Sequence, residues 1–525
     1  MLLRHPSRFL TAEAAENAEF YFVFSALSAF SAVELSQQHP RGGLSKEEPV
    51  KNWQFVIFVI TIALLFAFLF QLNRYTAYRE LLAPGLSLAG LPVGEQAEEE
   101  ARAHLEEAFS TPLTLHYLNE TTTLNPKKVD FRLQIDATME QARQVTAQSD
   151  FWRGFLDYLL GRSAESIDLP VQSRLDEEAV RQQLLEIAAR YDHPLQPPRA
   201  VVSSLTYLPG RREQRLDVEA SLPLVIAALN SATQREIELV VRLGDEEPPP
   251  IDMTVLQQML EGRLDNFDGV YSIYVKDLTS GEELALNADV AYAGMSILKI
   301  AVMVEAYRHL DGPPDQDTTK ILTETMTLSG NFTANLLLRY VIGDGDAYRG
   351  VQRLNESLRY LGLVNTFMAT PYDEDVLPQH IRTPANSRMD INTNPDPFMQ
   401  TTPQDMGLLL EMIYQCANGG GTLIAAYPDQ ITPGECRDML DMMSKNHIGA
   451  LIEAGVPEGT RVAHKHGWIG DTHGDAGIVF SPGGDYVLCM YLHHPDWLEW
   501  GVSSPIMADL SQAVYRYFNR QDNPG

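Results

Sequence analysis

The clearest apolar run in the chain is segment 52–73, which has 22 residues without a charge between Lys51 and Arg74. At about 1.5 Å of rise per residue, such a helix reaches roughly 33 Å, enough to cross a bilayer's apolar core. Trp53 and Tyr75 stand where interfacial aromatic residues are expected. The pattern predicts a transmembrane helix over 52–73. A buried core helix is the alternative, and a cleaved signal peptide fits less well because no small-x-small site follows the run.

Basic residues around this segment predict its orientation. Three shortly precede it and two shortly follow it: Arg41, Lys46, Lys51, Arg74 and Arg79. The excess on the N-terminal side favours a cytoplasmic tail over 1–51 and an extracytoplasmic chain after the span. A second apolar stretch, Phe20–Val33, has only 14 residues and three serines. Its length suits an interfacial or core helix better than a span.

The region 82–245 mixes short strand and helix patterns. Polar and apolar residues alternate over 111–117, which predicts a strand, and 237–243 reads as a further strand. Apolar residues recur at three- and four-residue steps over 99–109 and 177–191, which predicts two amphipathic helices. Ser, His, Cys and carboxylate residues do not cluster here. The region is therefore predicted to be a separate mixed α/β module for binding or spacing.

The segment 244–250, GDEEPPP, predicts a domain boundary, because three consecutive prolines fit neither a helix interior nor a central strand. The domain 251–525 that follows has strand patterns near both of its ends and helical patterns between them. The strands are expected at 269–276, 283–286, 476–480 and 486–492, and helices at 255–264, from Ser296 onward and at 505–518. This order predicts an α+β fold, an antiparallel sheet with an inserted helical lobe.

Charge and cysteine content exclude several classes of protein. The 525 residues carry 40 Lys and Arg against 70 Asp and Glu, a formal net charge of −30, which disfavours binding to nucleic acid. Three cysteines form neither a disulfide framework nor a cysteine-rich zinc site. Cys416 and Cys436 are candidates for one disulfide outside the membrane, or else small core residues. Cys489 is expected in the core.

Ser296 and Lys299 form an S-x-x-K motif at the start of a predicted helix. A spacing of three places both side chains on one face. A desolvated lysine there takes the serine proton and makes the hydroxyl nucleophilic. The alternative for this motif alone is an N-cap serine followed by an exposed lysine.

Two later motifs occur in a fixed order after the first. Ser329-Gly330-Asn331 precedes an apolar helical run, and Lys465-His466-Gly467 precedes a strand-like, glycine-rich run. The order S-x-x-K, S-x-N, K-x-G resembles the signature of class A β-lactamases and penicillin-binding proteins. The resemblance covers nearly all of 251–525 and implies a β-lactamase/transpeptidase-like fold.

The resemblance also implies roles for individual residues. Ser296 is the acylated nucleophile, Lys299 its general base or proton shuttle, and Ser329 a proton relay to the leaving nitrogen. Substrate contacts are implied for Asn331, Lys465, His466, Gly467 and Trp468. Of these, the Trp468 backbone N–H pairs with that of Ser296 to form an oxyanion hole. No cofactor is implied, and a zinc site at His464, His466 and His473 is disfavoured by their spacing.

The sequence departs from the family pattern at three places. Gly330 stands where the family more often has Asp, and His466 stands where it usually has a hydroxyl residue. The stretch 361–402 lacks the E-P-x-L-N motif whose glutamate activates the deacylating water. Asp373, Glu374 and Asp375 are the nearby substitutes, and the sequence gives no geometric reason to choose among them. The departure implies acylation followed by slow deacylation.

The region after the span also resembles a known module. Segments 86–105 and 216–229 are similar to the peptidoglycan-binding-like module of membrane-tethered proteins of the VanW/YoaR type. The whole chain is therefore expected to be a membrane-anchored extracytoplasmic serine hydrolase, with the cell wall and lipid bilayer as partners. β-Lactams or D-Ala-D-Ala-like peptidoglycan stem peptides are the expected substrates. Two alternatives stay open, a non-hydrolytic cell-wall binding or sensing protein of this fold, and an esterase or amidase for a small substrate.

Overall fold

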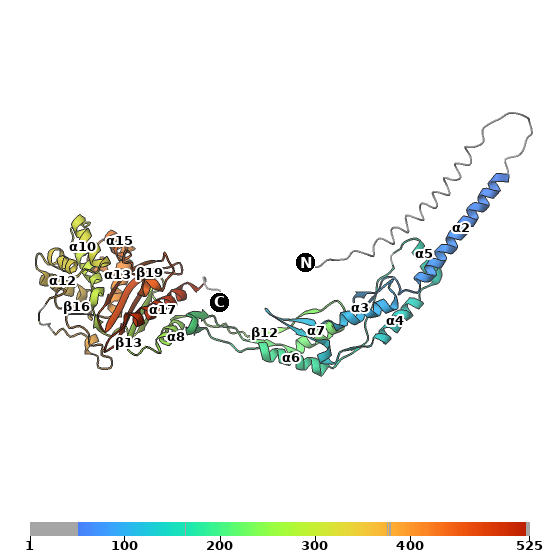
Figure 1. The fold of residues 1–525 in the computed structure, drawn as a ribbon, viewed down its shortest axis with the longest axis horizontal. Helices are drawn as coiled ribbons and strands as arrows, with labels where there is room; N and C mark the ends of the chain where they lie inside the picture. The colour runs from blue at the N-terminus through green and yellow to red at the C-terminus, as the bar shows by residue number, and fades with distance from the viewer. Residues whose placement is uncertain (1–50, 163, 375, 377–379, 521–525) are drawn as a thin grey trace, which may run out of the picture. The chain divides into compact units, whose positions relative to one another are not determined.

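The computed structural model describes residues 51–162, 164–374, 376 and 380–520. The expected tail before Lys51, including the apolar stretch 20–33, lies outside these residues, as does Asp375. The chain forms two compact units that interleave along the sequence (Figure 1). The first unit ends its opening segment at Ser110 and also contains Arg132–Arg174 and Asn230–Thr233.

Helix α2 (Lys51–Tyr78) is the longest element of the first unit and confirms the helix expected at 52–73. By length and apolar composition, with a mean hydropathy of 2.8, its segment Phe55–Tyr78 could cross a membrane. In Figure 1 its N-terminal half extends past α5, away from the other helices of the first unit. The unit's other elements are β1 (Leu86–Leu88), β2 (Leu91–Pro92), α3 (Glu98–Ser110), β5 (Arg132–Leu133), α4 (Ile135–Ala147), α5 (Phe151–Leu159), β6 (Ile167–Leu169) and β7 (Ser173–Arg174).

The second unit begins with small sheets covered by two helices. Strand β3 pairs antiparallel with β4 and parallel with β11, and helices α6 and α7 contribute to one apolar cluster with them. The single strand expected over 237–243 is wrong, because β11 and β12 pair with different sheets and leave 239–240 between them. These elements are β3 (Leu113–Tyr117), β4 (Glu120–Leu124), η1 (Pro126–Val129), α6 (Glu177–Tyr191), β10 (Gln214–Leu216), α7 (Val218–Leu229), β11 (Glu236–Glu238) and β12 (Val241–Leu243).

Residues 199–208 pack on the helices of the C-terminal domain. They form β8 (Arg199–Val201), η2 (Val202–Ser204) and β9 (Thr206–Leu208). Leu205 belongs to the same buried cluster as the apolar side of α8, and Tyr207 donates a hydrogen bond to the carbonyl of Ala513 at 2.9 Å. A fragment that begins at 251 therefore lacks part of this apolar cluster.

The C-terminal domain is built on a five-stranded antiparallel sheet with the order β14-β13-β20-β19-β18. This agrees with the expected sheet, because strands near both ends of the domain meet and helices lie between them in sequence. Side chains alternate along each strand, so one face joins the cluster around α13 and the other the cluster of α8 and α17 (Figure 1). The sheet strands are β13 (Val270–Asp277), β14 (Glu283–Leu286), β18 (Arg461–Trp468), β19 (Thr472–Phe480) and β20 (Tyr486–His493).

Short caps and turns set the boundaries of the helical lobe. Helix α13, for example, begins with Pro403 after Thr402, whose hydroxyl accepts from the backbone N–H of Asp405 at 3.1 Å. The remaining elements of the domain are α8 (Met253–Leu264), β15 (Tyr292–Ala293), η3 (Met295–Leu298), α9 (Lys299–Arg308), α10 (Gln316–Thr327), α11 (Asn331–Leu336), η4 (Leu337–Ile342), α12 (Ala347–Tyr360), β16 (Phe367–Met368), η5 (Ala385–Ser387), β17 (Met399–Thr401), α13 (Pro403–Ala417), α14 (Gly421–Ala426), α15 (Pro433–Met443), α16 (Leu451–Ala454) and α17 (Trp500–Phe518).

The three cysteines have distinct environments. Cys416 of α13 and Cys436 of α15 form a disulfide, with their Cα atoms 5.9 Å apart. Cys489 is a free thiol that is fully buried in β20, as the sequence predicts. The disulfide joins two helices of the lobe on the same side of the sheet.

Candidate active site

Ser296 lies in a tight turn that begins with a strained residue. The helix expected to start at Ser296 begins instead as the 3₁₀ turn η3, and α9 follows from Lys299. Met295 has a φ of 50°, which a non-glycine residue rarely adopts, and its carbonyl accepts a hydrogen bond from Tyr372 Oη at 3.2 Å. Ser296 is the one residue from 291 to 300 that is not buried. The turn therefore leaves the Ser296 hydroxyl accessible while its neighbours in the chain are buried.

Lys299 connects the serine to two further polar side chains. Its Nζ lies 2.8 Å from Ser296 Oγ and 2.7 Å from Asn331 Oδ1. Asn331 Nδ2 in turn donates to the Asp373 carboxylate at 3.0 and 3.1 Å. Lys299 is fully buried, which excludes the alternative of an N-cap serine beside an exposed lysine. The structure thus brings together the first motif and the asparagine of the second.

The environment of Lys299 favours its neutral form. Burial, with a smaller contribution from the charge of Lys465, lowers the pKa of Lys299 to about 7, while the Asp373 carboxylate opposes this shift. Lys299 Nζ also lies 4.3 Å from the centre of the Tyr372 ring. A neutral amine at hydrogen-bond distance from a hydroxyl is the arrangement that general-base activation of serine requires.

Gly467 allows strand β18 to approach the serine closely. A Cβ atom at this position would lie 2.8 Å from Met295 Cβ and 2.9 Å from the backbone nitrogen of Ser296. The absence of a side chain therefore brings the backbone of 467–468 beside the Ser296 amide. Trp468 and Ser296 line the same pocket.

Lys465 and His466 are both buried on β18. Burial lowers the pKa of Lys465 to about 8, and its Nζ donates to the His466 carbonyl at 3.1 Å. Burial, followed by the charge of Lys465, lowers the pKa of His466 to about 4, so this imidazole is neutral near pH 7. The His466 ring stacks on Trp468 with centroids 5.2 Å apart.

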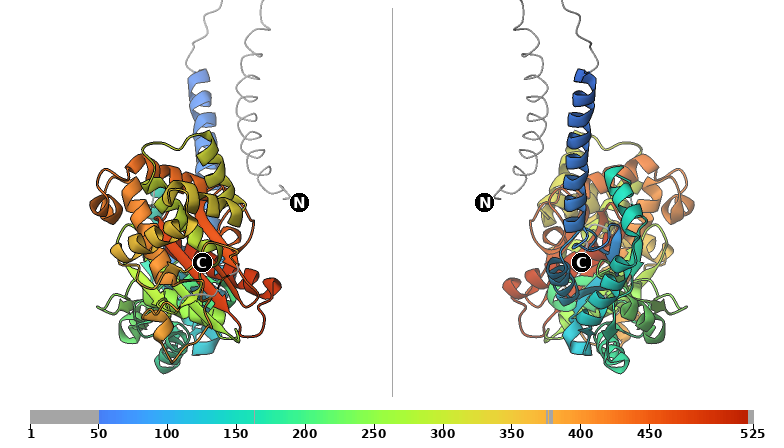
Figure 2. Two further views of the ribbon diagram at one scale, coloured as in Figure 1. Left: turned by 90° about the vertical axis from the view of Figure 1, so that its left-hand side faces the viewer. Right: turned by 90° about the vertical axis from the view of Figure 1, so that its right-hand side faces the viewer.

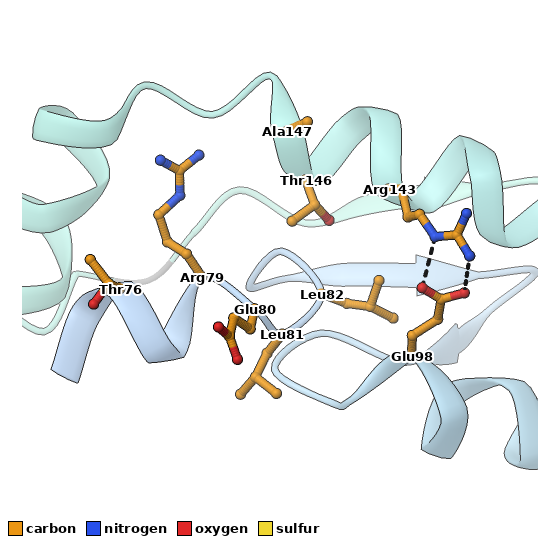
Figure 3. A pocket seen from close by; sticks show the side chains of 9 residues that line it. All are labelled: Thr76, Arg79, Glu80, Leu81, Leu82, Glu98, Arg143, Thr146 and Ala147. Carbon is orange, nitrogen blue, oxygen red and sulfur yellow. Dashed lines mark hydrogen bonds and ion pairs between the residues drawn. The ribbon is translucent and has the colours of Figure 1, made fainter. Parts of the chain in front are cut away.

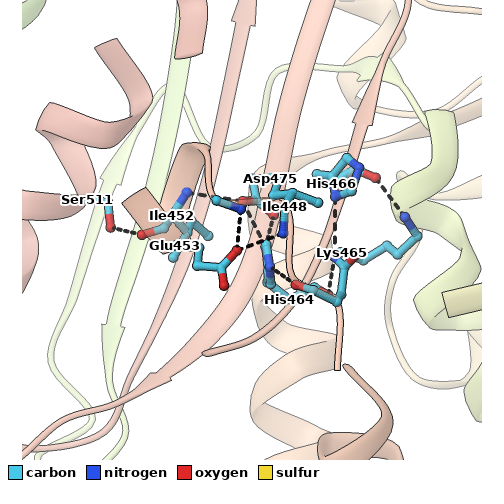
Figure 4. A network of polar contacts seen from close by, with 10 residues as sticks. Ile448, Ile452, Glu453, His464, Lys465, His466, Asp475 and Ser511 are labelled. Carbon is cyan, nitrogen blue, oxygen red and sulfur yellow. Dashed lines mark hydrogen bonds and ion pairs between the residues drawn. The ribbon is translucent and has the colours of Figure 1, made fainter. Parts of the chain in front are cut away.

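His464 of β18 and Asp475 of β19 form a buried ion pair. His464 Nδ1 lies 2.9 Å from Asp475 Oδ1, and its Nε2 lies 2.8 Å from the Asn446 carbonyl (Figure 4). Burial opposes charge on His464, but the Asp475 carboxylate outweighs it and raises the pKa of this histidine. Figure 4 shows Lys465 extending away from this pair, as strand alternation requires. The pair ties β18 to β19 at the level of the K-x-G motif.

The second motif adopts a turn that explains its glycine. Ser329 has a φ of 59°, and Gly330 precedes helix α11. A Cβ at Gly330 would lie 2.5 Å from Thr333 Oγ1, which is hydrogen bonded to Thr325. The common aspartate therefore does not fit here unless Thr333 moves. Ser329 is partly exposed and is not among the residues that line the pocket beside Ser296.

A pocket of about 300 Å³ opens at Ser296. Asn331 and Trp468 line it, together with residues from the 361–402 stretch, including Asp373, Glu374 and Asp396. A second pocket of about 630 Å³ shares Trp468 and Ile469 with it and is lined by two more tryptophans, Trp497 and Trp500. The candidate site thus has a small polar pocket next to a larger aromatic one.

Of the two described carboxylates that the sequence left open, Asp373 and Glu374, both line the pocket, and Asp373 is the one hydrogen bonded to Asn331. The Glu374 carboxylate lies 3.5 Å from Tyr348 Oη. The backbone of the preceding Tyr372 is fixed by Asn335, which donates to its carbonyl at 2.8 Å and accepts from its N–H at 2.9 Å. The loop therefore places an aromatic ring, and then a carboxylate, next to Lys299.

Sequence reasoning missed several of these residues. The roles of Tyr372, Asn335 and the His464–Asp475 pair depend on contacts between segments far apart in the chain. Periodicity and spacing in the sequence gave no signal for these contacts. Within the described ranges, no group of three or more His, Cys, Asp and Glu residues is placed to hold a metal ion.

The fold and the Ser296–Lys299 pair define a β-lactamase-like serine hydrolase domain. The sequence matches the Beta-lactamase enzyme family over residues 255–319 and 315–518, which together cover half of the chain. The chain therefore belongs to the beta-lactamase enzyme family through its C-terminal domain.

Individual relatives are more distant. A beta-lactamase of Bacillus licheniformis is 36% identical over 90 residues, which is 17% of this chain and 29% of that enzyme. The structure of PBP-A is similar at 21% identity, with 52% of this chain and 100% of that chain covered and a TM-score of 0.40. A beta-lactamase from Sphaerobacter thermophilus is similar at 18% identity, covering 51% and 98% of the two chains with a TM-score of 0.39.

Proposed function

We propose that this protein is a membrane-anchored, extracytoplasmic serine hydrolase that is acylated at Ser296 by β-lactams or by D-Ala-D-Ala-like peptidoglycan stem peptides. One observation carries the proposal. A buried amine with a pKa of about 7, that of Lys299, lies 2.8 Å from the one hydroxyl that the turn presents to the pocket. Membership of the beta-lactamase enzyme family supports the same reaction class.

In the proposed acylation, Lys299 Nζ takes the proton of Ser296 Oγ as the oxygen attacks the substrate carbonyl carbon. The backbone N–H groups of Ser296 and Trp468 stabilise the developing oxyanion, and the proximity that Gly467 allows supports this assignment. The carbonyl–nitrogen bond then breaks, and the proton that Lys299 took from Ser296 passes through Ser329 to the leaving nitrogen. Asn331 holds the substrate amide.

Lys465 supplies positive charge near the pocket and attracts a substrate carboxylate. His466 stands beside it as a neutral group, since its pKa is about 4. It therefore contributes a hydrogen bond and no charge to substrate binding. Gly467 contributes its backbone alone.

Deacylation is proposed to be slow. The side chain beside Lys299 on the loop is the Tyr372 ring, and the nearby Asp373 carboxylate already accepts both contacts from Asn331 Nδ2. Tyr372 offers no carboxylate to activate water, and the Asp373 carboxylate is held by Asn331. The protein would then behave as a penicillin-binding enzyme that holds its acyl group, and not as an efficient β-lactamase.

The proposed location rests on α2 and on the disulfide. Helix α2 is long and apolar enough to anchor the chain, and the Cys416–Cys436 bond suits an oxidising compartment outside the cytoplasm. Residues 82–245 would then be a peptidoglycan-binding-like module of the VanW/YoaR type, between the anchor over 52–73 and the hydrolase domain over 251–525. This places the site near the cell wall.

The test is a time course of covalent labelling. The full chain in detergent is incubated with penicillin G, and the protein mass is followed by mass spectrometry. The full chain is used because residues 199–208 complete the apolar cluster of the C-terminal domain. An adduct that forms once per chain, persists for hours and is lost in Ser296→Ala is expected, with Ser280→Ala in the exposed β13–β14 turn as the matched control. An adduct that remains in Ser296→Ala contradicts the nucleophile assignment.

A non-hydrolytic cell-wall binding or sensing protein is the second candidate. The altered second and third motifs, together with Tyr372 beside Lys299, favour it. Saturable binding of a peptidoglycan stem peptide without any acyl adduct would support it. An esterase or amidase for a small substrate is a third candidate. It would turn over a small ester or amide, whereas the proposed function requires a lasting penicillin adduct.

A further inference from the structure

Helix α5 packs against the C-terminal part of α2, although 72 residues separate them in sequence (Figures 1 and 2). The Phe155 ring lies edge-on to Phe68 with centroids 5.7 Å apart, and it lies 5.3 Å from Tyr75. Phe151 and Tyr158 contact the same tyrosine at 5.4 and 5.5 Å. Phe68 belongs to the uncharged segment of α2 and Tyr75 follows it. The contacts therefore span the place where the membrane surface is expected.

The adjoining side of α5 is apolar and uncovered. Trp152, Leu156, Leu159 and Leu160 are 63%, 52%, 46% and 55% exposed. Their spacing of four, three and one residues places them along one side of a helix. A short helix in water does not ordinarily keep four large apolar side chains, at α5 and its C-cap, 46% to 63% exposed on one side.

The polar residues of α5 form a narrow third side. Arg153 is exposed, and Asp157 makes an ion pair with Arg162 at 3.6 Å. Asp150 caps the helix by accepting from the Arg153 backbone N–H at 2.8 Å. The helix thus has one side against α2, one uncovered apolar side and one charged edge, which is the pattern of a helix that lies in a membrane interface.

We propose that α5 is an interfacial helix, which inserts Trp152, Leu156, Leu159 and Leu160 into the outer leaflet beside α2. This inference rests on the membrane anchor of the proposed function. The occupant of the apolar side is lipid because that side lies next to the exposed apolar surface of α2, where Leu64 and Leu65, one turn before Phe68, are 65% and 56% exposed. Trp152 suits the interface, where an amphipathic ring has both apolar and polar surroundings.

The neighbouring pocket favours apolar insertion over recognition of a specific anionic headgroup. It is lined by residues of α2, α3, α4 and the segment that follows α2, including Arg79 and Arg143 (Figure 3). Arg143 is paired with Glu98 through two contacts, and Arg79 donates to the Ser149 carbonyl at 3.2 Å. Both guanidinium groups are thus engaged within the protein, so the binding is expected to depend on apolar burial.

Insertion of α5 would give the first unit a second contact with the membrane and would fix its orientation at the membrane surface. A single helix leaves the following domain free to rotate about its axis, whereas a second helix in the leaflet prevents that rotation. The C-terminal half of α2 and α5 then form one wedge of aromatic side chains at the membrane surface.

The test uses spin labels on the full chain in vesicles of phosphatidylcholine and phosphatidylglycerol. Cysteine is introduced in Leu156→Cys, in Arg153→Cys on the charged edge, and in Phe66→Cys within α2. The native cysteines do not compete, because two form the disulfide and Cys489 is buried. Collision rates with oxygen, which partitions into lipid, and with a water-soluble nickel chelate are measured by electron paramagnetic resonance.

Labels at 66 and 156 are expected to collide with oxygen severalfold more than with the chelate, and the label at 153 to show the reverse. A lipid-exposed label at 66 with a water-exposed label at 156 overturns this inference alone. A label at 156 shielded from both reagents also overturns it, since a second copy or another protein then covers α5. A water-exposed label at 66 overturns the membrane anchor itself, and the inference with it.

Discussion

The buried ammonium group of Lys465 lowers the pKa of Lys299, the lysine that contacts Ser296 Oγ. The charge of Asp373, which is hydrogen bonded to Asn331, raises the pKa of the same lysine. The pKa of the candidate base, Lys299, therefore depends on its burial and on two neighbours of opposite charge, Lys465 and Asp373. This balance makes the pH dependence of acylation a direct test of the site.

Acylation of Ser296 by penicillin is expected to speed up as pH rises through about 7, because Lys299 acts as a base only when neutral. Asp373 raises the pKa of Lys299, so Asp373→Asn is expected to shift the rising limb to lower pH. Lys465 lowers that pKa, so Lys465→Met is expected to shift it to higher pH. The second-order acylation rate is measured from about pH 5 to 9. Shifts of the same sign in both variants would contradict the electrostatic assignment.

Gly467→Ala is expected to slow acylation by about 100-fold, the order of a lost oxyanion-hole donor. The new Cβ would lie 2.9 Å from the Ser296 nitrogen, so β18 must move away from the serine. Gly501→Ala is the matched control, since a Cβ there meets nothing within 4 Å. Acylation rates and thermal unfolding of both variants are compared. Equal acylation rates in both variants would contradict the role of Gly467 in bringing β18 close to Ser296.

Tyr372→Phe is expected to destabilise the protein by about 1 kcal/mol, because the buried carbonyl of Met295 loses its hydrogen bond. It should also slow acylation severalfold, since the same bond holds Met295 in the left-handed conformation next to Ser296. Tyr340→Phe, at a tyrosine that is 64% exposed, is the control. Denaturant unfolding and labelling rates measure the two effects. Loss of stability with unchanged labelling would assign Tyr372 a purely structural role.

Much of the C-terminal fold follows from local patterns in the sequence. Runs rich in β-forming and apolar residues predicted β13 and β20, and the order of strands and helices predicted the sheet with its inserted lobe. The pattern failed at 237–243, where one apolar run serves two sheets. A run of alternating residues indicates extended backbone but does not say which partner each half will have.

The candidate site could be predicted only in part, for a similar reason. Ser296 and Lys299 are three residues apart, so local geometry places them together. Asp373 contacts Asn331 across 42 residues of sequence, and Tyr372 contacts Met295 across 77. Those contacts depend on how an irregular loop folds back on the lobe, which neither spacing nor periodicity encodes.

Reduction of the Cys416–Cys436 disulfide is expected to lower stability by about 3 kcal/mol, from the entropy of a loop of 20 residues. The variant Cys416→Ser/Cys436→Ser should reproduce the loss, and reducing agent should then have no further effect. Thermal unfolding with and without dithiothreitol measures both. In the native protein the buried Cys489 is expected to resist thiol reagents. A reductant effect that persists in the double variant would contradict this assignment.

Asp475→Asn is expected to destabilise the protein by about 3–5 kcal/mol at about pH 6, because it leaves His464 buried without its partner. The pKa of His464 is raised, so its contribution is complete below about 6.5 and is lost as pH rises through the raised value. The pKa of Asp475 is lowered, so its contribution is present above about 3.8 and is lost as pH falls through the lowered value. The difference in the free energy of unfolding between the variant and the wild type should therefore be largest between about pH 3.8 and 6.5, and it should shrink in alkaline solution. Denaturant unfolding across pH measures it, with Asp441→Asn in the exposed pair with Arg461 as a control that costs less than about 1 kcal/mol. A loss that does not change with pH would mean that the pair is not ionised in the folded protein.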